Sequence, residues 1–289
     1  MSDDPFVTHR SLLFTVAYEM LGSAVDAEDV LQETWLRWDG VERDEVRDPR
    51  AYLVRIVTRQ ALNRLRTVRR QREEYVGAWL PEPLLTGPDV ADDVELAEGV
   101  SLAMLTVLET LSPTERAVFV LREVFDVPYA EIASAVDKSE AAVRQIAHRA
   151  RSHVAARRPR RQVDRGEQQR VVAQFIAAVS TGDMQGLMDL LAPDVVFLAD
   201  GGGIANAVKV PIVGLKKVAN LLRAYPAWTT DPSIETVVLN GALGVRFDDA
   251  KSGPTLVSLV VEDGLITQVF AMRNPEKLGS LAEEAELRR

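Results

Sequence analysis

The strongest constraint on the fold lies between Val127 and Arg151, where two short stretches of helical periodicity are separated by a polar turn. Ser139 stands where a helix N-cap belongs, and Glu140 falls in the following turn, where the helix dipole favours a carboxylate. The apolar positions recur three or four residues apart: Ile132, Ala133 and Val136 in the first helix, and Val143, Ile146, Ala147 and Ala150 in the second. This pattern predicts a helix-turn-helix whose two apolar stripes pack on each other.

The opposite face of the second predicted helix carries side chains suited to binding DNA. They are Arg144, Gln145, His148 and Arg149. Arginine can pair with guanine edges or phosphates, and glutamine can pair with adenine. We therefore expect this helix to enter a DNA groove.

Composition excludes several other classes of protein. A length of 289 residues indicates two or three domains, and a hydrophobic content of 47% is ample for packed cores. No stretch approaches about 20 consecutive apolar residues, and the start MSDDPFVTHR lacks the pattern of a signal peptide, so we expect a cytoplasmic protein. With no cysteine and only three histidines, we expect no disulfide, no metal site and no cofactor.

The net charge of −9 is unusual for a DNA-binding protein, but the basic residues are concentrated. Residues 50–75 hold eight arginines and two acids, and residues 141–161 hold seven arginines and no acid. Between them, residues 76–100 hold six acids and no base. Either basic block alone could be a solvated helix face, but two blocks beside a helix-turn-helix favour DNA binding. The acidic run could cover the arginines in the free protein.

The helical period changes to an alternating one along the chain. The helical pattern starts near Thr8, and a second helical unit opens near Val94. Helices are expected after two caps that are each followed by a first-turn proline, Asp48-Pro49 and Ser112-Pro113. After Arg161 the pattern predicts helices at 167–180 and 184–191, strands at 195–199, 235–239, 244–247, 256–261 and 266–271, and a hairpin at Asp263-Gly264. We expect domains at 1–75, 99–160 and 166–289, with 76–98 as an acidic, proline-containing linker.

Three segments of the helical part resemble the extracytoplasmic-function sigma factors of bacterial RNA polymerase. They are Asp26 to Trp38, Asp48 to Arg70, and Leu111 to Arg151. The resemblance implies that the first segment grips the clamp of the polymerase β′ subunit, the second recognises and melts the promoter −10 element, and the helix-turn-helix binds the −35 element. The implied partners are core RNA polymerase, through the β′ clamp and the β subunit, and promoter DNA.

The resemblance assigns candidate residues to each role. Polymerase contacts are Asp26, Glu28, Asp29, Leu31, Gln32, Glu33 and Trp35. The −10 contacts are Tyr52, Arg55, Arg59, Asn63, Arg66 and Arg70, and the −35 contacts are Ser139, Glu140, Arg144, Gln145, His148 and Arg149. An arginine stripe at helical spacing can follow a phosphate backbone, whereas Tyr52 is better interpreted as a core aromatic than as a platform for an unpaired base.

Two departures from the family pattern bear on the −10 contacts. Tyr52 stands where many members have tryptophan, and Arg59 and Asn63 stand where many have asparagine and aspartate. These departures leave the −10 base preference open. The loop from Val41 to Val46 lies where the family catches a flipped −10 base.

The C-terminal part is similar to SnoaL-like domains, a cone-shaped α+β fold, through residues 177–203 and the PIVG segment at 211–214. A subgroup of sigma factors, the SigJ type, carries this extension with WLPEP, DGGG and NPDKL-like motifs, present here at 79–83, 200–203 and 274–278. The implied fold is multidomain, with two all-α sigma domains followed by an α+β cone-shaped SnoaL-like domain. In this subgroup the extension regulates the attached sigma factor, so a separate anti-sigma factor is not required. The candidate interdomain and regulatory residues are Trp79, Pro81, Asp200, Gly201, Gly202, Gly203, Asn274, Pro275 and Lys277.

Two further hypotheses come from other functional classes. A ligand-sensing repressor or activator would share the helix-turn-helix, but it would have no use for the segment from Asp26 to Trp38. An enzyme of the SnoaL type fused to a DNA-binding module would need a poised acid or base, for which Asp200 is the candidate. Asp200 precedes three glycines and is better interpreted as a turn cap or docking residue, so we expect no catalytic residues. Whether a small molecule binds in the cone stays open.

Overall fold

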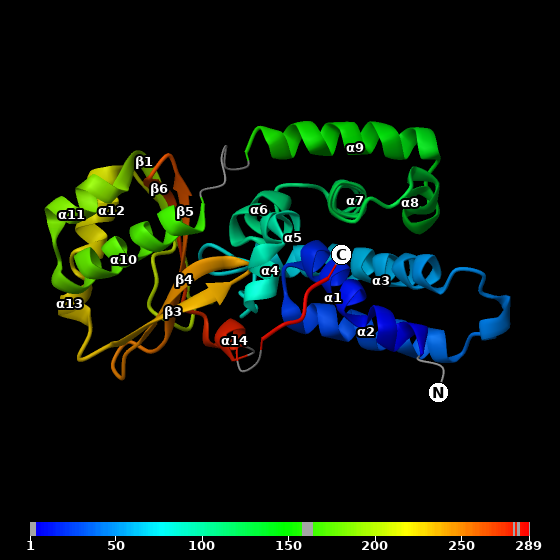
Figure 1. Cartoon of the computed structure of the whole chain (residues 1–289), viewed down its shortest axis with the longest axis horizontal. Coiled ribbons are helices and arrows are strands. Elements are labelled where there is room, and N and C mark those ends of the chain that lie inside the picture. The colour runs from blue at the N-terminus through cyan, green and yellow to red at the C-terminus, as the bar shows by residue number, and fades with distance from the viewer. Residues whose placement is uncertain (1–3, 158–163, 280, 282–283, 289) are drawn as a thin grey trace. The chain divides into compact units, whose positions relative to one another are not determined.

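The computed structural model describes residues 4–157, 164–279, 281 and 284–288 (Figure 1). The chain forms two compact units, which are described separately below. The first contains the stretch up to Glu74, residues 86–158 and the last residues of the chain; the second contains Tyr75–Leu85 and residues 159–284. No helix among the described residues is long and apolar enough to cross a membrane.

The first unit is helical, as the apolar periodicity predicts. Its helices are α1 (Pro5–Leu21), α2 (Ala24–Asp39), α3 (Pro49–Glu73), α4 (Pro88–Asp92), α5 (Val94–Val100), α6 (Leu102–Leu108), α7 (Pro113–Phe119), α8 (Tyr129–Val136) and α9 (Glu140–Ala155), with a 3-10 turn at Arg43–Glu45 and a π-helical turn at Val120–Val124. The caps expected from the sequence are present. Asp48 accepts a hydrogen bond from the Ala51 amide at 3.0 Å, and Ser112 and Glu115 form a reciprocal capping box at the start of α7.

The helix-turn-helix is formed by α8 and α9. Asp137 ends α8 in the left-handed region at φ 55°, and the Ser139 hydroxyl accepts a hydrogen bond from the Ala142 amide to begin α9. The apolar stripes predicted for the two helices are buried. The sequence prediction of this motif is therefore confirmed.

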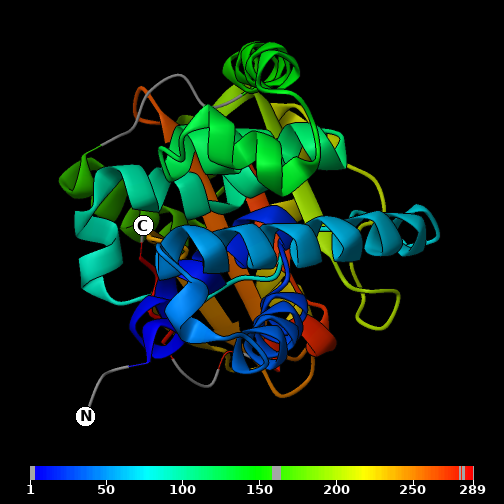
Figure 2. The same cartoon turned by 90° about the vertical axis from the view of Figure 1, so that its right-hand side faces the viewer.

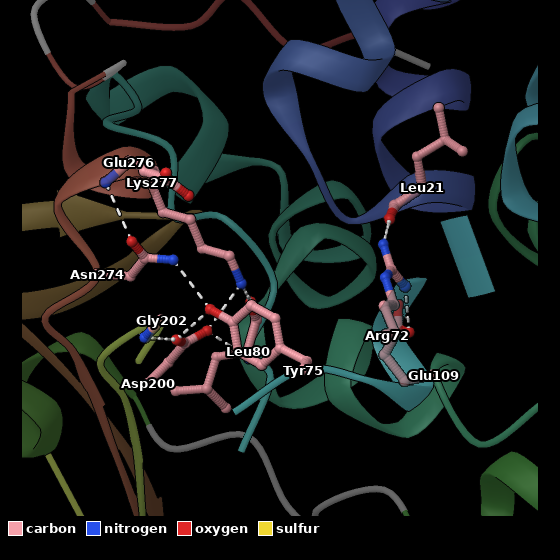
Figure 3. Close-up of polar contacts among 10 residues, drawn as sticks. All are labelled: Leu21, Arg72, Tyr75, Leu80, Glu109, Asp200, Gly202, Asn274, Glu276 and Lys277. Carbon is pink, nitrogen blue, oxygen red and sulfur yellow. Dashed lines mark hydrogen bonds and ion pairs between the residues drawn. The ribbon is translucent and has the colours of Figure 1, made fainter. Parts of the chain in front are cut away.

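A buried guanidinium joins the early and late helices of this unit. Arg116 of α7 is 1% exposed, and its Nε donates to the backbone carbonyl of Glu19 in α1 at 2.9 Å. Its guanidinium also pairs with Glu109. Glu109 pairs in turn with Arg72 of α3, which donates to the carbonyl of Leu21 at 2.5 Å, as Figure 3 shows. Burial alone would raise the pKa of Glu109, but the two guanidinium groups outweigh it and hold that pKa below its usual value. Removing one member of such a network leaves a buried charge unpaired, at a cost of roughly 3–5 kcal/mol.

The second unit is a six-stranded mixed sheet covered by helices on one face (Figure 1). Its strands are β1 (Leu191–Asp200), β2 (Ile212–Val213), β3 (Ser233–Leu239), β4 (Ala242–Asp248), β5 (Thr255–Glu262) and β6 (Leu265–Met272), in the order β2-β1-β6-β5-β4-β3. Its helices are α10 (Arg165–Thr181), α11 (Met184–Leu190), α12 (Leu215–Leu222), α13 (Tyr225–Trp228) and α14 (Pro275–Leu278). The α+β prediction is confirmed. The parallel pairing of β1 with β6 was not predicted, because it joins strands far apart in the sequence.

Two tight turns connect the antiparallel strands. Asp263 and Gly264 have φ values of 49° and 80°, as the expected hairpin requires, and they join β5 to β6. Asn240 and Gly241 form a second turn of the same kind between β3 and β4, which the sequence analysis did not single out.

The two faces of the sheet have different partners. Phe197 and Ala199 belong to the core beneath the helices. Asp200 is the partner of Met272 in the β1–β6 register, so both point to the opposite face, together with Leu256 of β5. That face receives the Tyr75–Leu85 segment, whose Leu80 amide binds the Asp200 carboxylate.

The stretch expected to be a linker is largely buried. Leu80 is 1% exposed, and Leu84 exchanges hydrogen bonds with Asn240 of the β3–β4 turn. From Thr86 onward the chain belongs to the helical unit, where α4 and most of α5 lie within the predicted acidic linker. The segment before Thr86 is held by the backbone hydrogen bonds of Leu80 and Leu84 within the α+β unit, a property that proline content alone does not reveal.

The buried carboxyl of Glu19 should make the stability of the helical unit depend on pH. Glu19 is 0% exposed, and its two carboxyl oxygens have no hydrogen-bond partner among the described residues. Burial raises the pKa of Glu19 to about 8, with partial opposition from Arg116. Below the ordinary glutamate pKa the carboxyl is protonated whether the unit is folded or not. As the pH rises toward about 8 only the unfolded chain ionises, so stability is lost over this window.

We predict that Glu19→Gln stabilises the helical unit by roughly 1–3 kcal/mol at pH 8, and that the gain shrinks toward zero near pH 5, because glutamine does not titrate. Thermal unfolding followed by circular dichroism at the two pH values measures this difference. Glu42→Gln, at an exposed position, is the matched control. A gain independent of pH, or equal in the control, would contradict the burial account.

Candidate functional site

The outer face of α9 is exposed to solvent. Arg144, Gln145, His148 and Arg149 are all exposed, while the alternate face of the helix is buried. In both views α9 runs along the outside of the helical unit (Figures 1 and 2). The structure therefore brings these four predicted −35 contacts together on one accessible surface.

The first turn of α9 is organised by its own side chains. Ser139 is exposed and caps the helix, and Glu140 forms an ion pair with Arg144. The Arg144 guanidinium also lies over the Tyr129 ring, 5.4 Å from its centroid. Exposed pairs of this kind contribute little stability, so phosphate or a base edge can replace Glu140 as the partner of Arg144.

The predicted −10 stripe on α3 is partly occupied within the same unit. The Arg59 side chain donates hydrogen bonds to the backbone carbonyls of Ser134, at 2.7 Å, and Ala135, at 3.4 Å. These carbonyls lie at the C-terminal end of α8, where the helix dipole attracts a cation. The Arg59 side chain, although exposed, is thus bound by the first helix of the helix-turn-helix and not by the acidic run considered above.

The rest of the stripe is arranged in two parts. Asn63 and Arg66 are exposed and follow Arg59 along α3, with 3.4 Å between an Arg66 nitrogen and the Asn63 side-chain oxygen. Arg55 is half-buried over the Tyr52 ring, 5.0 Å from its centroid, and Tyr52 packs on Trp38. The side chain of Arg70 lies outside the described residues.

The loop expected to catch a flipped base borders a pocket of about 480 Å³. Val41, Val46 and Tyr52 line it on one side, and Glu131 and Ile132 of α8 line it on the other. The same helix that binds Arg59 therefore also forms a wall of this pocket.

The predicted polymerase-binding face of α2 is polar and carries internal pairs. Asp26 and Asp29 pair with Arg64 of α3, Glu28 pairs with Arg10 of α1, and Glu33 accepts a hydrogen bond from Gln60 at 2.6 Å. Gln32 is exposed, and Trp35 is half-buried against Phe6. Leu31 is only 2% exposed, so it supports α2 from the core and does not offer a contact surface.

A second site is centred on Asp200 in the α+β unit (Figure 3). Asp200 is 0% exposed, and one of its oxygens accepts hydrogen bonds from the Tyr75 hydroxyl at 2.6 Å and the Gly202 amide at 3.0 Å. The other accepts from the Leu80 amide at 2.9 Å and from Lys277 Nζ at 2.7 Å. Both oxygens are engaged by donors of this chain, which is the arrangement of a structural clamp.

Lys277 and Asn274 complete this clamp from the end of the sheet. Lys277 Nζ also donates to the Leu80 carbonyl at 2.5 Å and lies over the Trp79 ring, 4.1 Å from its centroid. Asn274 donates to the Tyr75 hydroxyl at 2.9 Å and caps α14, whose first residue is Pro275. Burial, reinforced by the hydrogen bond to Asp200, raises the pKa of Tyr75, so the phenol stays a donor. We call the residues Tyr75, Trp79, Leu80, Asp200, Asn274 and Lys277 the linker clamp.

Each glycine of the DGGG segment is required for a different structural reason. Gly202 has a φ of 64°, and a Cβ there would meet the Asn274 side chain at 2.5 Å. A Cβ on Gly201 would meet the carbonyl of Ala205 at 2.4 Å, and Gly203, at φ 75°, lies against Val76. Pro81 is buried with the rest of the linker. Close approach of Ala205 and Asn274 thus explains Gly201 and Gly202, and close approach of the linker at Val76 explains Gly203.

Sequence analysis missed Tyr75 and Leu80 of the linker clamp and the buried ion-pair network of the helical unit. Tyr75 was assigned to the first sigma domain, although an aromatic residue at the start of a buried proline-rich stretch was a usable signal. The network of Arg72, Glu109 and Arg116 carried no local signal, because its members are distant in the sequence. No group of three or more potential metal ligands occurs in the part of the chain that the structure describes.

Comparisons with known proteins place the site in context. The sequence matches the family Sigma-70 region 2 over residues 6–71 and the family Sigma-70, region 4 over residues 101–154. It is 36% identical to the ECF RNA polymerase sigma factor SigJ of Mycobacterium tuberculosis, with 96% of this chain and 93% of the relative covered. It is 32% identical to the probable ECF RNA polymerase sigma factor SigI of the same species, with coverage of 96% and 94%. The crystal structure of M. tuberculosis SigJ superposes with a TM-score of 0.78 at 34% identity, covering 96% of this chain and 98% of that one.

The linker clamp predicts a strong coupling between Asp200 and Lys277. We expect Lys277→Met to increase hydrogen exchange at the Leu80 amide about tenfold or more, because an unpaired buried carboxylate destabilises the docked linker. Asp200→Asn should have a similar effect. In the double variant, the loss of free energy of linker docking, measured from exchange at Leu80, should be smaller than the sum of the losses in the two single variants. Lys217→Met, at an exposed position, is the control. Strict additivity, or unchanged exchange at Leu80, would contradict the clamp.

Proposed function

The chain belongs to the extracytoplasmic-function RNA polymerase sigma factors, and from this premise we propose how its surfaces divide the work of promoter recognition. As a sigma factor it binds core RNA polymerase and promoter DNA and directs transcription initiation. The observation that carries the division of roles is the exposed face of α9, where Arg144, Gln145, His148 and Arg149 lie opposite a buried apolar face. We assign this face to the −35 element.

The α3 stripe is assigned to the −10 element, and the polar face of α2 to the polymerase clamp. Arg59, Asn63 and Arg66 follow one face of α3 and are spaced to meet successive phosphates. The acids of α2 suit a basic partner helix, and their present partners Arg10 and Arg64 are half-exposed and replaceable. Leu31 and Tyr52 act in this scheme as supports for the two helices rather than as primary contacts.

The free protein, in this proposal, is closed for −10 recognition. Arg59 is bound to α8, and the pocket beside the Val41 to Val46 loop has α8 as one wall. Core polymerase would separate α8 from α3 and release this surface. The hydrogen bonds between Arg59 and two backbone carbonyls are worth about 1–3 kcal/mol each at most, which polymerase binding can exceed.

The α+β domain is proposed to modulate the sigma domains through the linker that it holds. The linker clamp fixes residues 75–85, the segment that joins the two sigma regions in sequence. A docked linker restricts how far those regions can separate, so clamp stability sets the ease of opening. In this proposal a separate anti-sigma factor is not required. It also leaves Asp200 without a free oxygen for acid–base chemistry, and we propose no catalysis by this domain.

The −35 assignment predicts a loss of promoter affinity without loss of polymerase binding. Arg149→Ala should weaken promoter binding by roughly 1–3 kcal/mol and lower the salt dependence, because a groove contact is lost. Arg170→Ala, an exposed arginine of the α+β unit, should leave both unchanged. Promoter binding and run-off transcription with purified core polymerase, on a promoter mapped after overexpression, measure this. Equal losses of promoter affinity in Arg149→Ala and Arg170→Ala would contradict the assignment of α9 to the −35 element.

The regulatory role predicts that the clamp affects transcription. Lys277→Met should change run-off output several-fold at an equal concentration of polymerase-bound protein, since the freed linker alters the opening equilibrium. Lys217→Met should not. Identical output from the wild type and Lys277→Met, with linker docking lost as judged by hydrogen exchange, would refute a regulatory role for the linker.

A further inference from the structure

The α+β unit contains a pocket of about 700 Å³ on the helix-covered side of its sheet. Its wall is mainly apolar and aromatic, with Phe175, Phe197, Phe247, Tyr225 and Trp228 contributing rings. Ligand pockets in proteins commonly have this size and this apolar character. The pocket therefore has room for the hydrocarbon body of a small molecule.

The charged residues that line the pocket are all positive. Lys251 and Arg273 are the charged residues that line the pocket, and none of its lining residues is acidic. The nearby Asp249 carboxylate is used by the backbone amides of Thr230, at 2.7 Å, and Ser252, at 2.8 Å, and does not line the pocket. An anionic group is therefore favoured over a neutral or cationic one.

Two donors in the wall lack acceptors. The Tyr225 hydroxyl and Arg273 Nε are shielded from solvent and have no hydrogen-bond partner among the described residues. Burial, with the charge of Asp249, raises the pKa of Tyr225 to about 12, so its hydroxyl carries a proton. Other nitrogens of Arg273 are held by the carbonyls of Asn206 and Ser252, both at 2.5 Å, which fixes the guanidinium in place. Unsatisfied buried donors are costly, and a carboxylate is the acceptor that suits both.

We propose that this pocket binds a small amphipathic carboxylic acid. Its hydrocarbon part packs among the phenylalanine rings, and its carboxylate accepts hydrogen bonds from Tyr225 and Arg273 once the neighbouring side chains that shield these two donors move aside. Lys251 adds positive charge at the same side of the pocket.

The pocket and the linker clamp share two strands. Ala199 of β1 lines the pocket and the next residue, Asp200, is the centre of the clamp; Arg273 lines the pocket and the next residue, Asn274, binds Tyr75. The Arg273 amide donates to the Asp200 carbonyl at 2.7 Å. A ligand that orders Arg273 therefore stabilises the strand ends that hold the linker. The binding proposal stands alone, whereas its effect on transcription rests on the regulatory role proposed above.

The probe for this proposal is decanoate, with decanol as the matched molecule without a carboxylate. Isothermal titration of the full-length protein, at ligand concentrations up to about 1 mM, should give saturable binding of decanoate, with decanol at least about tenfold weaker. Tyr225→Phe keeps the ring and should weaken decanoate binding about fivefold or more, while Lys217→Met, at an exposed position that does not line the pocket, should not. Circular dichroism checks that each variant is folded.

Several results would overturn the proposal. Equal affinity for decanol and decanoate would remove the carboxylate site, and so would unchanged affinity in Tyr225→Phe. Absence of saturable binding of either probe to folded wild-type protein would remove the ligand site altogether. Hydrogen exchange at Leu80 should slow on decanoate binding; binding without this change would contradict the link to the clamp. Because no polymerase is present, failure here is distinguishable from failure of the sigma factor assignments.

Discussion

The buried guanidinium of Arg116 is the interaction on which the closed helical unit depends. It binds the carbonyl end of α1 directly, and through Glu109 and Arg72 it reaches α3 and the carbonyl of Leu21. These contacts join the helices of the first sigma region to those of the second. With the regions held together, α8 lies against α3 and the backbone carbonyls of Ser134 and Ala135 occupy Arg59.

The charged groups of Arg116, Glu109 and Arg72 suit a contact between two sigma regions that must later separate. An apolar interface would give comparable or greater stability, but its two halves would expose hydrophobic surface once separated. Arg116, Glu109 and Arg72 can each be solvated after separation, which lowers the cost of the open form. Glu19 fits the same logic, because its neutral carboxyl becomes ionised once water reaches it. The linker clamp repeats the principle in the α+β unit, with Asp200 and Lys277 as the buried pair.

Local sequence patterns predicted much of the fold and part of the candidate site. The helical spacing of Val143, Ile146, Ala147 and Ala150 was enough to place Arg144 and Arg149 on the exposed face, because both depend on a single helix. Asp48, Ser112, Ser139 and the Asp263-Gly264 pair marked their caps and turn for the same reason. The motif resemblance also drew Asp200, Asn274 and Lys277 into one group. By contrast, the hydrogen bond of Arg59 to α8, the partner role of Tyr75, and the pocket beside Arg273 depend on chain segments far apart in sequence. Their energies come from burial and pairing that no local pattern encodes.

The distance between α3 and α8 tests the closed form most directly. The chain has no cysteine, so single cysteines at Thr67 in α3 and at Lys138, two residues after α8, both exposed, can carry a pair of spin labels. Electron–electron resonance on the free protein should give one short distance, and the complex with core polymerase and promoter should give a longer one. A short distance that persists in a transcribing complex, or a long one in the free protein, would contradict the account that Arg59 is bound to α8 until polymerase binds.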